Sequence, residues 1–257
     1  RWLRTIPLYF VALIFYTAIS NNFNFDFFKF LFFLQKMLPN FADKDYFMVA
    51  WSLSIEEFFY LIFPIYLIIF NKKEPYKLTM YFIIFLIAAK ILSHDYLSND
   101  FLRTGTILRL DSIAFGFLLS FYYLKIINFK KSIILFASVL IFIFINYQKS
   151  FFTNSSIFTV YFIILSQSLS VFIVLLFYNL ETLIKNNYFK SICNILATQT
   201  YSVYLFHLII MHFLIMIDNV FINTLFVYIF ILFISSTIIF RYFEKPILKL
   251  RPVYKNE

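Results

Sequence analysis

One stripe of polar side chains, Ser52, Ser54 and Glu56, lies inside an otherwise apolar stretch that begins at Trp51, a common interfacial anchor, and continues through Tyr60. Residues four apart share a helix face, so Ser52 and Tyr60 accompany Glu56 on one side of a helix. A carboxylate in apolar surroundings can act as a general base or position a hydroxyl group. The alternative for Glu56 and its neighbour Glu57 is contact with headgroup water at a span end.

A second polar group, Arg109 and Asp111, opens another apolar stretch. Residues two apart do not face each other on a helix, so the two charges need partners on other helices. The sequence predicts a Glu56–Arg109 pair across helices, and such a pair could also be purely structural. Gly116, further along, is expected to allow close helix packing.

Two further groups of residues could bind a ligand or take part in a reaction. Tyr201, Tyr204 and His207 share a helix face, and a neutral imidazole both donates and accepts a hydrogen bond. The alternative for His207 is a satisfied structural group. Arg1 and Arg4 lie one turn apart and could grip phosphates, or they could be ordinary positive-inside anchors.

The elements that must position these groups are membrane helices. Of 257 residues, 62% are hydrophobic and 14% are charged, and the mean hydropathy is +0.84. The sequence predicts an all-α, polytopic transmembrane helical bundle of about eight spans, with a short interfacial helix at 25–38. The predicted spans are 6–20, 49–70, 77–92, 107–124, 132–147, 157–178, 200–217 and 220–240.

Charge sets the expected orientation. Most of the 22 Lys and Arg residues fall in the loops on one side of these spans, which predicts that both termini are cytoplasmic. The net charge of +9 therefore reflects topology, and nucleic acid is not an expected partner. The one cysteine, Cys193, excludes an internal disulfide and a thiolate metal site, and it is expected to be small, apolar and buried.

Taken together, the motifs resemble those of the acyltransferase-3 family of membrane O-acyltransferases. The resemblance runs through the whole chain, from the paired arginines with Ile6, Pro7 and Tyr9 to a closing Glu244-Lys245-Pro246. Between them lie the Trp-Ser-Leu-Ser-x-Glu run at 51–56, the Arg-x-Asp…Gly element at 109–116 and the Tyr-Ser-x-Tyr-Leu-x-His element at 201–207.

The resemblance implies a fold, an activity and ligands. Family domains have about ten spans, so residues 1–257 are expected to be a single domain that lacks the first two helices, including the histidine regarded as catalytic in the family. The implied activity moves an acetyl group from acetyl-CoA to a hydroxyl of a cell-surface or lipid-linked polysaccharide. No metal is expected.

The topology, taken with the resemblance, suggests roles for residues, in which Glu56, Arg109 and Asp111 would position an acceptor or orient the missing histidine. Catalytic roles fall to Glu56, Arg109, Asp111 and His207. Arg1 and Arg4 would bind the cofactor. The acceptor would be bound by Trp51, Ser52, Ser54, Tyr60, Tyr201 and Tyr204. The expected location is the lipid bilayer of a bacterial inner (plasma) membrane.

Two other functions stay open from the sequence. A polysaccharide exporter or flippase would more typically show internal repeats and Gly/Pro-broken helices, and this chain has two glycines. An inactive remnant of the acyltransferase is the other alternative.

Overall fold

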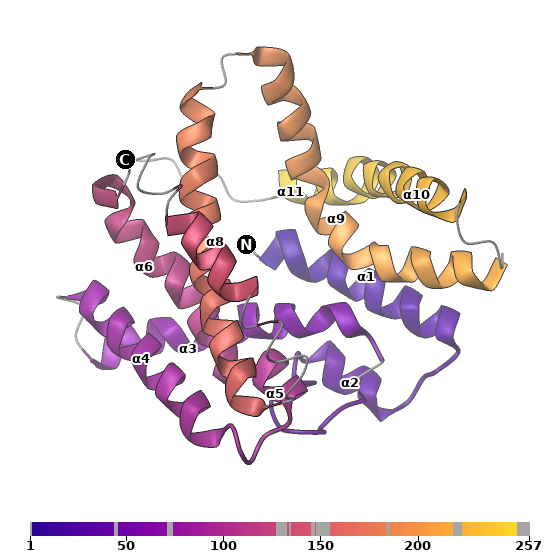
Figure 1. The fold of residues 1–257 in the computed structure, drawn as a ribbon. Coiled ribbons are helices and arrows are strands. Elements are labelled where there is room, and N and C mark those ends of the chain that lie inside the picture. The colour runs from indigo at the N-terminus through magenta and orange to yellow at the C-terminus, as the bar shows by residue number, and fades with distance from the viewer. Residues whose placement is uncertain are drawn as a thin grey trace. The chain divides into compact units, whose positions relative to one another are not determined.

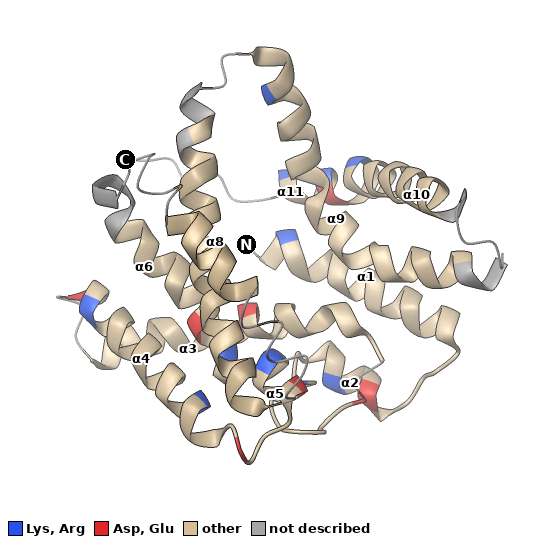
Figure 2. Ribbon diagram, in the orientation of Figure 1, with Lys and Arg blue, Asp and Glu red and all other residues tan. Residues whose placement is uncertain are grey.

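The computed structural model describes residues 2–43, 46–70, 74–126, 133, 135–144, 147, 155–183, 186–217 and 223–250. Their regular secondary structure is helical, with no strand among the described residues (Figure 1). Acidic and basic residues are sparse along these helices (Figure 2). The predicted all-α class is confirmed.

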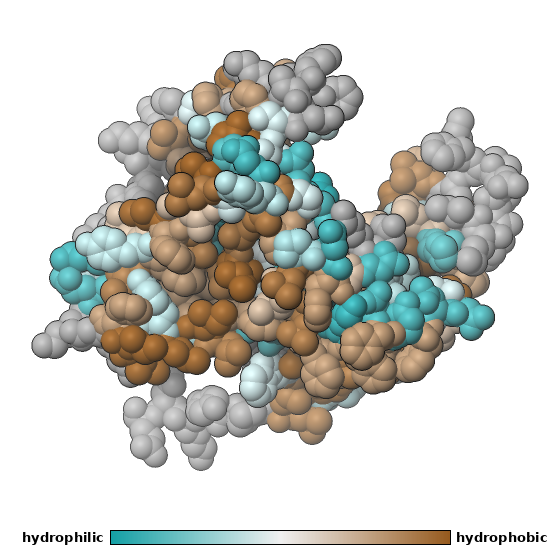
Figure 3. Space-filling view, turned by 90° about the horizontal axis from the view of Figure 1, so that it is seen from below, coloured by the Kyte–Doolittle hydropathy of each residue, from teal (hydrophilic) through white to brown (hydrophobic). Residues whose placement is uncertain are grey.

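Five helical segments are long and apolar enough to cross a membrane: Trp2–Ser20, Met48–Ile69, Pro75–Ser93, Ser156–Tyr178 and Leu225–Lys249. Each holds at least 18 residues, close to the roughly 20 that span the hydrocarbon of a bilayer. Much of their surface is apolar and exposed, as in Phe226 and Leu92, which are 80% and 78% exposed. The face drawn in Figure 3 shows the same abundance of apolar residues. Such a surface fits a lipid solvent.

The other predicted spans also contain helix. Residues 107–124 are covered by the 3₁₀ turn η2 (Ile107–Arg109) and by α6 (Leu110–Ile126), and 132–147 by an apolar helix at Leu135–Phe144. The helix α9 (Asn187–Ile217) covers 200–217. The part of 220–240 at 220–222 lies outside the described residues. The count of eight spans stays a prediction.

Two predicted boundaries differ from the structure. The interfacial helix is only α2 (Phe25–Leu31), because Phe33 has a positive φ of 61°, which ends the helix. Conversely, α9 starts well before 200, where the Asn186 side chain accepts from the amides of Tyr188 and Phe189 and caps the helix. Residues 186–198 are exposed, so Cys193 is an exposed free cysteine and the prediction of a buried one was wrong.

The chain forms two compact units. The first, which we call the terminal unit, comprises Arg1–Phe32, Lys44–Ala50 and Asn186–Glu257. Its helices are α1 (Trp2–Ser20), α2, α9, α10 (Asn223–Ile239) and α11 (Lys245–Lys249), with the 3₁₀ turn η1 (Met48–Ala50) and the π-helical turn η3 (Phe240–Glu244). Tyr9 is fully buried here and donates to the carbonyl of Phe30 at 2.7 Å, which ties α1 to α2.

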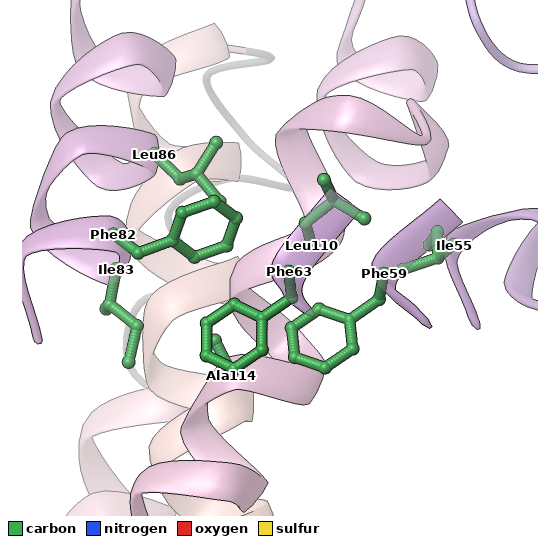
Figure 4. Close-up of a cluster of buried hydrophobic side chains, with 8 residues drawn as sticks. All are labelled: Ile55, Phe59, Phe63, Phe82, Ile83, Leu86, Leu110 and Ala114. Atoms are coloured by element: carbon green, nitrogen blue, oxygen red, sulfur yellow. The ribbon is translucent and has the colours of Figure 1, made fainter. Parts of the chain in front are cut away.

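The second, which we call the central unit, comprises Phe33–Asp43 and Trp51–Lys185. Its helices are α3 (Trp51–Ile69), α4 (Pro75–Ser93), α5 (Asn99–Thr104), α6 and α8 (Ser156–Leu183). Figure 4 shows its core, in which Phe59 and Phe63 of α3 meet Phe82 of α4 and Ala114 of α6. This packing fixes α3, α4 and α6 around the polar residues described next.

Candidate functional site

The central unit contains a fully buried ion pair. Lys90 of α4 donates to Asp111 Oδ2 of α6, and both side chains are 0% exposed. Of the two, the sequence analysis proposed only Asp111. Lys90 could have been found by the same criterion, because it is an ionisable residue in a long apolar stretch.

Arg109 lies two residues before Asp111 in the chain and interacts electrostatically with both charges of this pair. Among the described residues, Arg109 forms no ion pair, so the expected Glu56–Arg109 pair is not present. The reason is the placement of the helices: Lys90 of α4 supplies the partner of Asp111, whereas Arg109 faces residues of α8. Lys90, Arg109 and Asp111 therefore carry one net positive charge between them, and Arg103 is a further cation that interacts electrostatically with Arg109.

Hydrogen bonds connect α3 to Thr106, in the segment that leads into this site. Ser54 donates to the carbonyl of Trp51 at 2.7 Å, so the 3.0 Å contact between its hydroxyl and that of Thr106 is donated by Thr106. The Thr106 amide in turn donates to the carbonyl of Lys36 at 2.9 Å. Ser54, predicted to bind the acceptor, is fully buried and here holds the backbone that presents Arg109.

A pocket of about 220 Å³ lies between α6 and α8, which are neighbours in the central unit (Figure 1). Its polar lining comes from Arg109, Ser112, Ser166, Gln167 and Ser170. Its apolar lining comes from Phe115, Leu119, Val171 and Val174. Gln167 Nε2 donates to Ser112 Oγ at 3.0 Å and connects the two walls. The α8 side could not be predicted from the sequence, because serines and one glutamine in a span are common helix-packing residues.

Three buried polar atoms at this site have no hydrogen-bond partner in the described part of the chain: Arg109 Nε, Asp111 Oδ1 and Gln167 Oε1. Two of them, on Arg109 and Gln167, belong to residues that line the pocket. Buried polar groups in proteins are almost always paired, and each exception calls for an explanation such as a ligand. The site thus keeps one donor, Arg109 Nε, and one acceptor, Gln167 Oε1, buried beside the pocket without a partner among the described residues.

Gly116 lines the same pocket, and it does not serve close helix packing as the sequence analysis expected. A Cβ atom built on Gly116 would meet no atom within 4 Å among the described residues. The missing side chain therefore adds volume to the pocket. The other glycine, Gly105, differs: its Cβ would lie 2.6 Å from the carbonyl oxygen of Phe101, so a side chain is excluded there.

In the terminal unit, the predicted tyrosines bind backbone carbonyls. The Tyr201 hydroxyl donates to Thr5 at 2.7 Å and that of Tyr204 to Val49 at 2.5 Å. These bonds tie α9 to α1 and to η1. His207 Nδ1 lies 2.7 Å from the carbonyl of Tyr204, which makes Nδ1 the donor and leaves Nε2 as an acceptor.

A hydrogen bond between Ser202 and Glu244 connects the motif at 201–207 with the one at 244–246. Ser202, fully buried on α9, donates to Glu244, which is 5% exposed at the end of η3. Arg4 is exposed on the first turn of α1 and interacts electrostatically with Glu244. Arg1 lies outside the described residues.

The remaining predicted residues belong to the first turns of α3. Trp51 packs against the core cluster of the central unit, Ser52 and Glu56 are half-buried, and Tyr60 is 44% exposed. The predicted site residues thus divide between the two units, and a site that both groups share stays a prediction. The described residues contain no cluster of three or more His, Cys, Asp or Glu that could hold a metal ion.

Comparison with known proteins identifies the family. The model of an acyltransferase domain, that of the acyltransferase-3 family, matches residues 1–242. No curated protein and no solved structure matches the chain. The match covers almost all of the chain, including the buried charges of the central unit and the tyrosines of α9. The chain therefore belongs to the acyltransferase-3 family and is a membrane acyltransferase.

Proposed function

We propose that the protein transfers an acetyl group from acetyl-CoA to a hydroxyl of a cell-surface or lipid-linked polysaccharide, in the inner membrane of a bacterium. The observation that carries the proposal is the pocket between α6 and α8, which Arg109 and Gln167 line beside a buried ion pair among apolar helices. Unpaired polar atoms are costly in such surroundings unless a ligand pairs with them.

The chemistry assigns a role to each charge in the central unit. Acyl transfer needs a base near the attacking hydroxyl, a donor group for the developing oxyanion and a held thioester. In the proposal, Arg109 positions the acceptor and Glu56 takes the hydroxyl proton. Asp111 is a positioning residue, because it is held by Lys90 and balances one of the two neighbouring cations.

The donor is expected to approach from the cytoplasmic side. Arg1 and Arg4 would pair with the phosphates of coenzyme A, since guanidinium groups bind phosphate in a bidentate way. Both termini are then cytoplasmic, and the acceptor is bound toward the outer half of the bilayer. His207, Tyr201 and Tyr204 would contribute to the acyl-transfer path in the terminal unit, where the bonds to Thr5 and Val49 fix the two tyrosines.

The test measures acetylation of surface glycans in cells that produce the protein, with protein levels checked by immunoblot. Arg109→Ala and Glu56→Gln are expected to lower acetylation at least about tenfold, because each removes a group assigned to the acceptor. Lys77→Ala is the control: Lys77 is 47% exposed and pairs with Glu74 at 2.8 Å. Unchanged acetylation in both site variants at normal protein levels would contradict the proposal.

A further inference from the structure

The pocket between α6 and α8 has a size and a polarity that together define a ligand. At about 220 Å³ it is smaller than the roughly 300–1,000 Å³ of pockets for drug-sized ligands. It therefore has room for one sugar ring or a short chain, and any larger ligand would have to extend out of its opening.

The polar groups of the pocket differ between its two helices: those on α8 are mainly hydrogen-bond acceptors, and those on α6 are mainly donors. On the α8 side, Ser166 donates to the carbonyl of Ile163 and Ser170 to that of Ser166, so both hydroxyl oxygens face a ligand as acceptors. Gln167 is 6% exposed, its Nε2 is used by Ser112, and its Oε1 is a third acceptor, without a partner among the described residues. The α8 wall thus requires a ligand with hydroxyl donors.

The α6 side has the opposite character. Arg109 lines the pocket and has a buried Nε–H that lacks a partner within the described residues, and Ser112 accepts from Gln167, which leaves its own proton to donate. Asp111 is neutralised by Lys90, so the charge of Arg109 is not balanced by a described side chain. This wall requires an acceptor that carries negative charge.

We propose that the pocket binds one ring of the acceptor glycan and that Arg109 selects a ring bearing a carboxylate, as in a uronic acid. The carboxylate pairs with Arg109, the ring hydroxyls donate to Gln167 and the α8 serines, and the C–H face of the ring lies on Val171 and Leu119. This inference rests on the proposed function, because it names the class of acceptor that the enzyme would take.

The test uses cysteine protection, since the chain has one native cysteine. Ser170 is exposed at the pocket, and the substitution Ser170→Cys in a Cys193→Ser background places a reporter thiol there. The rate at which this thiol reacts with a small methanethiosulfonate reagent is measured in detergent micelles with matched pairs of methyl glycosides. Each pair, in the gluco, galacto and manno series, consists of the neutral sugar and its uronic acid.

We expect at least one uronic acid to protect the reporter thiol at about a tenfold lower concentration than its neutral counterpart. Arg109→Gln should remove this preference. Gly116→Leu should remove protection by filling the pocket, whereas Gly116→Ala, which adds one methyl into open space, should retain it. The native Cys193, exposed and outside the pocket, is the control and should be unprotected in a chain that retains it.

Several results would overturn the proposal: no reaction at the reporter thiol, no protection by any sugar, equal protection by acid and neutral sugar, or equal protection by acetate alone. Binding is read without an acyl donor, so the two proposals fail separately. Protection without any acetyl transfer would contradict the proposed function only. Acetyl transfer without selective protection would contradict the acidic-ring proposal only.

Discussion

The two units differ in how many of their buried polar atoms have a hydrogen-bond partner among the described residues. In the terminal unit, Tyr201, Tyr204 and Ser202 each donate to an identified carbonyl or carboxylate. In the central unit, Arg109, Asp111 and Gln167 each keep a buried atom without a partner among the described residues. In the described part of the terminal unit, only the Thr5 hydroxyl is in that condition. The difference indicates that Tyr201, Tyr204 and Ser202 hold helices of the terminal unit together, whereas Arg109 and Gln167 of the central unit lie beside a pocket that a ligand can enter.

The largest expected effect comes from breaking the ion pair of the central unit. Lys90→Met leaves Asp111 buried without its partner and should lower the free energy of unfolding by about 3–5 kcal/mol. Thermal unfolding in detergent micelles measures the change. Lys77→Met is the control, because Lys77 and its partner Glu74 are both about half exposed and little change is expected there. Equal shifts in the two variants would show that burial of the pair is not what stabilises the unit.

A smaller effect is expected from the buried bond of the terminal unit. Ser202→Ala removes the donor to Glu244 and should cost about 1.5–3 kcal/mol of unfolding free energy, because the carboxylate stays buried. Acetyl transfer per folded molecule should not change. Ser120→Ala, at an exposed serine that donates to its own helix carbonyl, is the control. Loss of transfer at unchanged stability would make Ser202 part of the chemistry and remove the contrast between the units.

The smallest effect concerns one hydroxyl group. Tyr204→Phe deletes the donor to the Val49 carbonyl and should lower the unfolding free energy by about 0.5–1.5 kcal/mol. The same substitution at Tyr188, which is 76% exposed, should have no measurable effect on the thermal unfolding curve. If both variants unfold like the unmodified protein, the Tyr204 bond does not stabilise the attachment of α9 to η1.

Much of the fold could be predicted from the sequence, because long apolar runs mark helices wherever the solvent is lipid. The boundaries were less predictable. The early start of α9 depends on the Asn186 cap and on a polar first half that hydropathy assigns to a loop. The prediction that Cys193 is buried was wrong for the same reason, because Cys193 lies in this exposed first half of α9.

The candidate site was predicted in part. Arg109 and Asp111 stand out as charges among apolar residues, but their partners depend on how three helices are rotated about their axes. That rotation places Lys90 against Asp111 and turns Arg109 toward Gln167. Gly116 shows the same limit, since a glycine in a span can either admit a neighbouring helix or leave a hollow, and only the packing decides.

The most direct test of the central claim separates the two possible uses of the buried pair. The double variant Lys90→Met/Asp111→Leu replaces it with apolar side chains and should recover most of the stability that Lys90→Met loses, because well-packed apolar substitutes for buried ion pairs are often neutral or stabilising. Acetyl transfer by this folded double variant is then measured against the unmodified protein. Our account predicts that transfer falls at least about tenfold, since Arg109 loses its electrostatic interaction with Asp111. Transfer at the unmodified rate would show that the pair is structural and would contradict the account.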